Sequence, residues 1–164
     1  MPVEPLLPPP APVAEQDYRT LRSLVARGGV TVLSGAGMST ASGIPDYRGP
    51  DGSRRVQPMQ YAEFLASAEN RRRYWARSYV GWSRFRAAGP NEAHHAVAAL
   101  QRSGHVEELI TQNVDGLHQA AGSTGVIELH GNLTDIVCLT CEERFDRAVV
   151  HRWIAEANPG FTAE

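Results

Sequence analysis

The chain has 164 residues, of which 42% are hydrophobic and 21% are charged, a composition typical of one globular domain. A net charge of −2 lacks the basic excess that phosphate contacts need, so we expect no nucleic-acid partner. No apolar run reaches the roughly 18 residues needed to cross a bilayer, and no signal peptide is visible. Two cysteines are too few for a disulfide framework. We therefore expect a cytoplasmic protein with no membrane association.

The first third of the chain predicts a tail, a helix, a strand and a glycine-rich turn. Residues 1–14 contain six prolines and predict a disordered or extended tail. Apolar residues at helical spacing predict a helix over 16–27, which two glycines end. The β-branched run 30–33 predicts a strand buried on both faces. It leads directly into glycines and small residues that could open a helix, an order typical of nucleotide-binding segments.

Further along the chain, helical and strand patterns alternate. We expect a long loop over 42–58, helices over 59–68, 70–87 and 92–102, and strands over 106–110 and 126–129, followed by a strand over 133–139 and a helix over 146–157. This alternation predicts an α/β open sheet, in which ligands bind outside the carboxyl ends of the strands. Three polar clusters, residues 35–48, 111–116 and 130–132, each directly follow a predicted strand.

The glycine segment is a partial match to a dinucleotide-binding fingerprint. Gly35 and Gly37 would let the backbone approach a pyrophosphate, whose charge the next helix N-terminus favours. Thr40 stands where the fingerprint has its third glycine, and the acidic residue expected about 20 residues on is missing. A plain tight turn is the alternative.

The other polar clusters also have a chemical and a structural interpretation. Residues 43–49 place an apolar side chain, a carboxylate and an arginine beside the candidate phosphate site, unless they form an ordinary surface loop. Gln112, Asn113 and Asp115 suit ribose hydroxyls, or else cap the next helix. His130 ends a strand and could act as a general base or be structural. His94 and His95 are adjacent on a helix and face apart, so we expect surface or core residues.

Cys138 and Cys141 have the spacing of half a tetrahedral zinc site. A redox pair is the alternative, although the motif follows a strand and does not begin a helix as in thioredoxin-like proteins.

Taken together and in this order, these clusters resemble the sirtuin family. The matching segments cover roughly residues 16–161: 35–39, 43–48, 90–94, 111–118, 128–131 and 138–141. Residues 73–77 and 80–82 look like the class II branch. The tyrosine and arginine of desuccinylating members do not align convincingly. The resemblance implies an incomplete Rossmann-like parallel sheet with a small helical, zinc-binding module inserted. Residues 15–164 would form the N-terminal part of the catalytic domain, and 133–164 the start of the module.

The resemblance also implies a reaction, NAD-dependent deacylation of acyl-lysine proteins, which yields nicotinamide, O-acyl-ADP-ribose and free lysine. By position, the catalytic residues would be His130, as general base, with Asn113 and Asp115. Cys138 and Cys141 would be two of four zinc ligands. The cofactor-binding residues would be Gly35, Ala36, Gly37, Ser39, Ile44, Asp46, Tyr47, Arg48, Gln112, Asn113 and Asp115.

The sequence leaves three functions open. A deacylase is the first, and mono-ADP-ribosyl transfer through the same bond cleavage is the second. The third is a non-catalytic fragment that binds NAD or a partner protein, because the second cysteine pair and the later strands of a sirtuin have no counterpart in this sequence.

Overall fold

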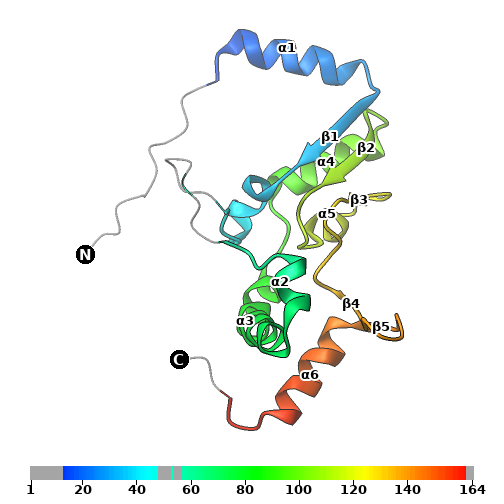
Figure 1. Cartoon of the computed structure of the whole chain (residues 1–164). Coiled ribbons are helices and arrows are strands. Elements are labelled where there is room, and N and C mark those ends of the chain that lie inside the picture. Colours follow the sequence, from blue (N-terminus) through cyan, green and yellow to red (C-terminus); the bar gives the residue numbers. More distant parts are fainter. Residues whose placement is uncertain (1–12, 48–52, 54–56, 162–164) are drawn as a thin grey trace, which may run out of the picture.

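The computed structural model describes residues 13–47, 53 and 57–161. Most of the expected N-terminal tail, 1–12, and the candidate cofactor residue Arg48 lie outside these residues. The described part forms a parallel three-stranded sheet with helices and a smaller antiparallel hairpin with its own helix (Figure 1). This arrangement confirms the predicted α/β class and its parallel sheet.

The sheet consists of β1 (Val30–Ser34), β2 (Val106–Thr111) and β3 (Ile127–Glu128), in that order. Both strand pairs are parallel, and Ser34 lies opposite Thr111, which in turn lies opposite Glu128. The carboxyl ends of all three strands therefore meet at one edge, where the polar clusters continue the chain.

Between β1 and β2 the described residues form one short 3-10 helix and three α-helices. They are η1 (Ala36–Ser42), α2 (Tyr61–Ala66), α3 (Ala68–Ala87) and α4 (Glu92–Arg102). Asn91 caps α4, because its side-chain oxygen accepts from the Ala93 and His94 amides. The buried core lies where α4 meets β2, with Ala98 and Leu109 both fully buried.

Three helices and a hairpin complete the described chain. The helix α1 (Glu15–Ala26) precedes β1 and extends away from the sheet in Figure 1. The short α5 (Leu117–Ala120) follows β2. After β3, the strands β4 (Asp135–Val137) and β5 (Arg144–Asp146) form an antiparallel pair, and α6 (Arg147–Ala157) follows directly. The strand expected over 133–139 is thus shorter and belongs to a hairpin. None of the described helices is long and apolar enough to span a membrane.

The prediction that the first strand is buried on both faces was wrong. Thr31 and Leu33 are exposed, and Leu33 shows 63% of its surface to solvent. The alternate residues of β1 are better covered, and Ser34 is buried. An apolar run indicates a strand but does not show how many of its faces are covered. In the described part of the chain, no element covers the Leu33 side chain.

Candidate active site

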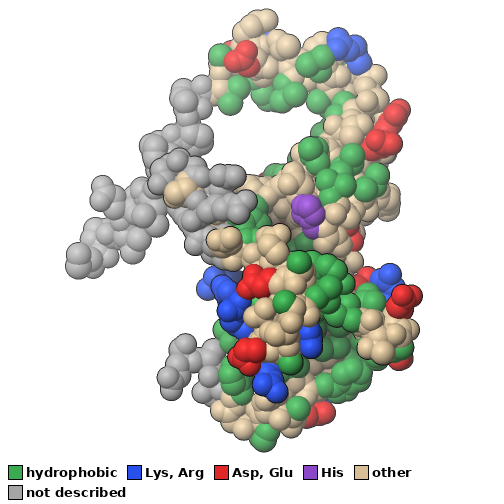
Figure 2. All heavy atoms as spheres, viewed as in Figure 1, with side chains coloured by type: hydrophobic (Ala, Val, Ile, Leu, Met, Phe, Trp, Pro, Cys, Tyr) green, Lys and Arg blue, Asp and Glu red, His purple; other side chains and the backbone are tan. Residues whose placement is uncertain are grey.

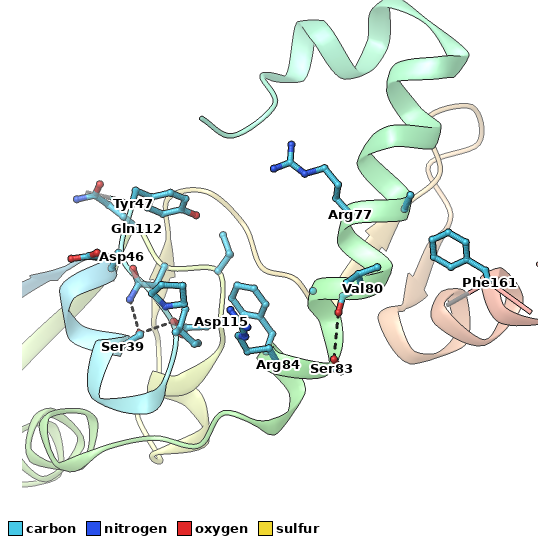
Figure 3. Close-up of a pocket in the computed structure, with 18 residues that line it drawn as sticks. Ser39, Asp46, Tyr47, Arg77, Val80, Ser83, Arg84, Gln112, Asp115 and Phe161 are labelled. Atoms are coloured by element: carbon cyan, nitrogen blue, oxygen red, sulfur yellow. Dashed lines mark hydrogen bonds between the residues drawn. The ribbon is translucent and has the colours of Figure 1, made fainter. Parts of the chain in front are cut away.

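A cavity of about 890 Å³ lies at the carboxyl ends of β1 and β2. Three segments line it: the start of η1 with the loop that follows it, the loop after β2, and one side of α3 (Figure 3). The volume falls within the range of about 300–1,000 Å³ that is usual for ligand and cofactor pockets. The lining residues used below are Ala36, Ser39, Ile44, Asp46, Tyr47, Arg77, Val80, Gly81, Arg84, Gln112, Asn113, Asp115 and Phe161.

A hydrogen-bonded network joins the glycine segment to the loop after β2. The Asn113 amide donates to the Gly35 carbonyl and to Ser39 Oγ, each at 3.0 Å. Ser39 Oγ donates in turn to Asp115 Oδ2 at 2.7 Å, drawn as a dashed line in Figure 3. The other carboxylate oxygen, Asp115 Oδ1, accepts from the Leu117 amide and so caps α5. The capping interpretation is therefore confirmed for Asp115, and both Asn113 and Asp115 line the cavity.

Ser39 is almost fully buried, and the turn after it depends on a glycine. Gly43 ends η1 in the left-handed region, at φ +82°, where other residues are strained. The turn lets the Ile44 amide donate to the Ser39 carbonyl at 3.2 Å and buries Ile44, which is 8% exposed. An apolar wall thus stands next to the polar network.

The segment around Asn91 and His94 ties α4 to η1. The Asn91 amide donates to the Met38 carbonyl at 2.8 Å and to Ser42 Oγ at 3.0 Å. His94 Nδ1 accepts from the Asn91 backbone amide and completes a capping box. His94 is fully buried and His95 is exposed, so the two histidines face apart as predicted.

A second buried layer lies behind Asn113. Thr111 Oγ1 accepts from the Asn113 backbone amide at 3.0 Å and from Ser34 Oγ at 2.9 Å. Ser34 Oγ also lies 2.8 Å from His118 Nε2, and the His118 ring packs edge-on against His94 at 4.9 Å. Burial lowers the pKa of both imidazoles, and the His94–His118 pair lowers that of His118 further. Asp115 acts in the opposite direction on both, more weakly than burial does.

The lowered pKa of His118 predicts that the fold loses stability as the pH falls. The unfolded chain gains its proton near the ordinary value of 6.5, whereas the folded chain gains it only at lower pH. Between these values the unfolded state binds more protons, so acidification favours unfolding. We expect His118→Gln to show a smaller decrease in melting temperature between about pH 7.5 and about pH 5.5 than the unmodified chain. The exposed His95→Gln should retain the full decrease, and an equal decrease in all three proteins would contradict the expectation.

The structure brings most of the sequence-predicted site residues together. The same cavity is lined by Ala36, Ser39, Ile44, Asp46, Tyr47, Gln112, Asn113 and Asp115. Gly35 contributes its carbonyl to the network. A Cβ added at Gly37 would meet no atom within 4 Å, so there is open space beside this residue. Neither glycine has a positive φ among the described backbone angles, and the Gly35 carbonyl accepts from the Met38 amide at 2.9 Å in the first turn of η1.

Two predicted groups lie outside the cavity. His130 is exposed beyond the end of β3, and it is not among the residues that line the cavity. Cys138 and Cys141 lie on the turn between β4 and β5, with free thiols. The Cys141 backbone amide, which hydrogen-bonds to Cys138, lowers the pKa of that thiol and favours the thiolate that metal ligands require. Among the described residues no third histidine, cysteine or carboxylate joins them.

Sequence reasoning missed the cavity wall that α3 provides. The cavity is lined by Arg77, Val80, Gly81 and Arg84, although none of them was predicted as a site residue. Two arginines seven residues apart lie on one helical face two turns apart, and this spacing was the available signal. The wall adds positive charge to a cavity that already holds the carboxylates of Asp46 and Asp115.

The parallel sheet, with its cavity at the strand carboxyl ends, defines a Rossmann-like α/β protein. A Sir2 family model matches residues 35–160, and the chain belongs to the Sir2 (sirtuin) family. NAD-dependent protein deacetylase 1 of Streptomyces coelicolor is 54% identical over 152 residues, 92% of this chain and 51% of that protein. NAD-dependent protein deacylase Sirt4 of Drosophila melanogaster is 46% identical over 155 residues, 92% of this chain and 50% of that protein.

Solved structures agree with this assignment. A structure described as "Sir2-p53 peptide-NAD+" matches with a TM-score of 0.74 and 37% identity, over 86% of this chain and 56% of that one. The chain spans about half the length of the curated relatives that it matches.

Proposed function

We propose that this protein is an NAD-dependent protein-lysine deacylase. The observation that carries the proposal is the network of Ser39, Asn113 and Asp115, which fixes two loops around one cavity in a Sir2 family chain. The 54% identical relative is named as an NAD-dependent protein deacetylase. The substrates would be acyl-lysine proteins, and the products nicotinamide, O-acyl-ADP-ribose and free lysine.

The cavity suits a dinucleotide on grounds of shape and chemistry. Its volume is ample, the backbone at Gly37 borders open space, and amide and carboxylate groups face the cavity beside apolar Ile44. NAD, when bound, supplies the bond between nicotinamide and ribose whose cleavage drives the reaction. Ile44 would exclude water from the nicotinamide end, because cationic ribose character must be protected from hydrolysis. Ala36, Ser39 and the two glycines would hold the pyrophosphate. Asp46, Tyr47 and Arg48 would belong to the cofactor loop.

Residues of the loop after β2 would bind the ribose, and His130 would accept a proton from it. Side-chain hydrogen bonds hold Asn113 and Asp115 beside the cavity, and a backbone hydrogen bond holds Gln112. These residues would bind ribose and the carboxamide. His130 would accept a proton from a ribose hydroxyl as general base, a task suited to a neutral imidazole. The hydrogen bonds of a catalytic base often form only in the substrate complex, which accounts for an exposed His130 outside the cavity.

The experiment that tests the function separates three outcomes. The protein is incubated with an acetyl-lysine peptide and NAD labelled in the adenosine half, and the products are resolved by mass. Acetyl-ADP-ribose in solution with free lysine on the peptide supports the deacylase. Label retained on the peptide or protein would replace it with mono-ADP-ribosyl transfer. A folded chain that binds no NAD by calorimetry would leave only a non-catalytic role.

We also propose that residues 133–164 begin a zinc module, in which Cys138 and Cys141 supply two of four ligands. Their spacing, their position on one turn and the favoured Cys138 thiolate support this donor role. We expect the reduced protein to bind added Zn²⁺ weakly in competition with a chromophoric chelator, because two ligands are half of a closed site. Cys138→Ser should abolish this binding, while Glu143→Gln, on the same turn, should leave it unchanged. Zinc binding by Cys138→Ser and Cys141→Ser as tight as that of the unmodified chain would remove the cysteines from the site.

A further inference from the structure

Arg147, the first residue of α6, is a buried cation. Only 1% of its surface is exposed, although a guanidinium stays protonated in proteins and is costly to bury alone. In the described part of the chain no carboxylate forms a salt bridge with it, and its Nε has no hydrogen-bond partner. Such a group is retained only where other contacts replace its hydration.

The replacing contacts all come from α3. The Arg147 guanidinium carbon lies 5.1 Å from the ring centre of Trp75 and 5.1 Å from that of Trp82. Its Nη2 donates to the Ser78 carbonyl at 3.0 Å. Attraction between a cation and an aromatic face is strongest for tryptophan and increases when the pair is removed from water. We call this arrangement of Arg147 with Trp75, Ser78 and Trp82 the guanidinium clamp.

A stacked ring pair extends the same contact by one turn of each helix. His151, four residues after Arg147 on α6, stacks on Tyr79 with ring centres 4.2 Å apart and planes at 12°. Tyr79 also meets Phe161 edge-on at 5.8 Å. Phe161 lines the cavity, as Figure 3 shows. The contact between α3 and α6 therefore reaches the cavity at this end of the chain.

Two sides of α3 contact different parts of the molecule. One side faces α6 and consists of residues at helical spacing, Trp75, Ser78, Tyr79 and Trp82. The neighbouring side lines the cavity and has the same spacing, with Arg77, Val80, Gly81 and Arg84. Any rotation or shift of α3 about its axis would carry these four residues out of their positions in the wall.

The other contacts of α3 hold mainly its first turns. Phe64 of α2 packs edge-on against Tyr74 with ring centres 5.0 Å apart, and Arg73 forms an ion pair with Glu63. The residues that line the cavity begin only at Ala76. The guanidinium clamp spans this later part of the helix.

We propose that Arg147 is a positioning residue whose guanidinium clamp fixes α3, and with it the α3 wall of the cavity. The clamp itself does not depend on the proposed function. Its consequence for NAD affinity does rest on that function. The hairpin and α6 would thus control the shape of the cavity from outside it.

The test compares Arg147→Met and Arg147→Lys with Arg152→Met, an exposed arginine on the same helix. All are made with Trp153→Phe, so that fluorescence reports only Trp75 and Trp82. Three measurements are made on each: acrylamide quenching of tryptophan emission, amide hydrogen exchange in peptides from residues 68–87, and NAD affinity by calorimetry. Arg147→Met removes the charge at similar volume, whereas Arg147→Lys keeps a cation but loses the planar fork.

For Arg147→Met we expect about a twofold increase in quenching, faster exchange across residues 76–85 and about tenfold weaker NAD binding. Arg147→Lys should give intermediate values, and Arg152→Met should match the unmodified chain. If Arg147→Met does not fold, the graded effect of Arg147→Lys on quenching and exchange decides the question.

Unchanged quenching and exchange in the Lys and Met variants would overturn the clamp. Altered quenching and exchange with unaltered NAD affinity would overturn the positioning role. If the unmodified chain binds no NAD, the proposed function fails, while quenching and exchange still decide the clamp.

Discussion

Replacement of His130 by alanine is expected to reduce peptide deacylation by about 10²- to 10⁴-fold, the usual contribution of a general base, while NAD still binds. Among the described residues, the imidazole has no part in the polar network of Ser39, Asn113 and Asp115 and is not in the lining of the cavity. Its removal should therefore affect the proton transfer and spare the binding site. Acetyl-lysine peptide turnover, followed by mass spectrometry at saturating NAD, measures the first quantity, and calorimetry with NAD measures the second.

The exposed His95→Ala on α4 is the matched control for this experiment. It removes an imidazole of similar exposure from a helix that the cavity does not include. Turnover in His130→Ala equal to that of His95→Ala would remove His130 from the mechanism. A loss of NAD binding in His130→Ala would instead make it a binding residue.

The order of strands and polar loops could be predicted from sequence because each signal was local. A β-branched run before Gly35 predicted β1, and the helical pattern over 92–102 predicted α4. The burial of β1 could not be predicted, because whether Leu33 is covered depends on elements remote in sequence. The strand β5 was missed for a related reason. Its three residues are too few to show a period, and their pairing with β4 determines the strand.

The candidate site was predictable where the polar clusters follow strands, since parallel strands bring their carboxyl ends to one edge. Ser39, Asn113 and Asp115 could be grouped in this way without knowledge of their hydrogen bonds. The α3 wall could not, because Arg77 and Arg84 lie on a helix whose rotation is set by packing on α6. Arg147 gave no signal in sequence. An arginine at the start of a helix is usually solvated, and only the structure shows it between two tryptophans.

The polar network at the cavity has a consequence for mutations within it. Each member bonds to at least two others or to backbone, so removal of one leaves a buried partner unsatisfied. An unsatisfied buried group costs about 1–3 kcal/mol. Variants of this network should therefore change both stability and binding, and their effects must be compared with a control that changes stability alone.

Asn113→Ala is expected to weaken NAD binding by at least about tenfold, and to lower the free energy of unfolding by about 1–3 kcal/mol. The substitution removes both amide hydrogen bonds, so that the Gly35 carbonyl loses its bond to the loop after β2 and Ser39 Oγ keeps only its bond to Asp115. The glycine segment is then held to the loop by fewer bonds, and the cavity loses part of its fixed shape. Calorimetric NAD affinity and urea unfolding measure the two effects.

Two further variants separate binding from stability. Leu109 belongs to β2 and is fully buried in the core where α4 meets this strand. Leu109→Ala should lower the free energy of unfolding by about 2–5 kcal/mol and leave NAD affinity unchanged at temperatures where the chain is folded. Asn158→Ala, an exposed amide at the end of α6, should change neither quantity by a measurable amount. If Asn113→Ala lost stability but bound NAD as tightly as the unmodified chain, Asn113 would be a structural residue only. The cofactor would then be held elsewhere along the cavity, because the side chain that bonds to both Gly35 and Ser39 would have no part in binding it.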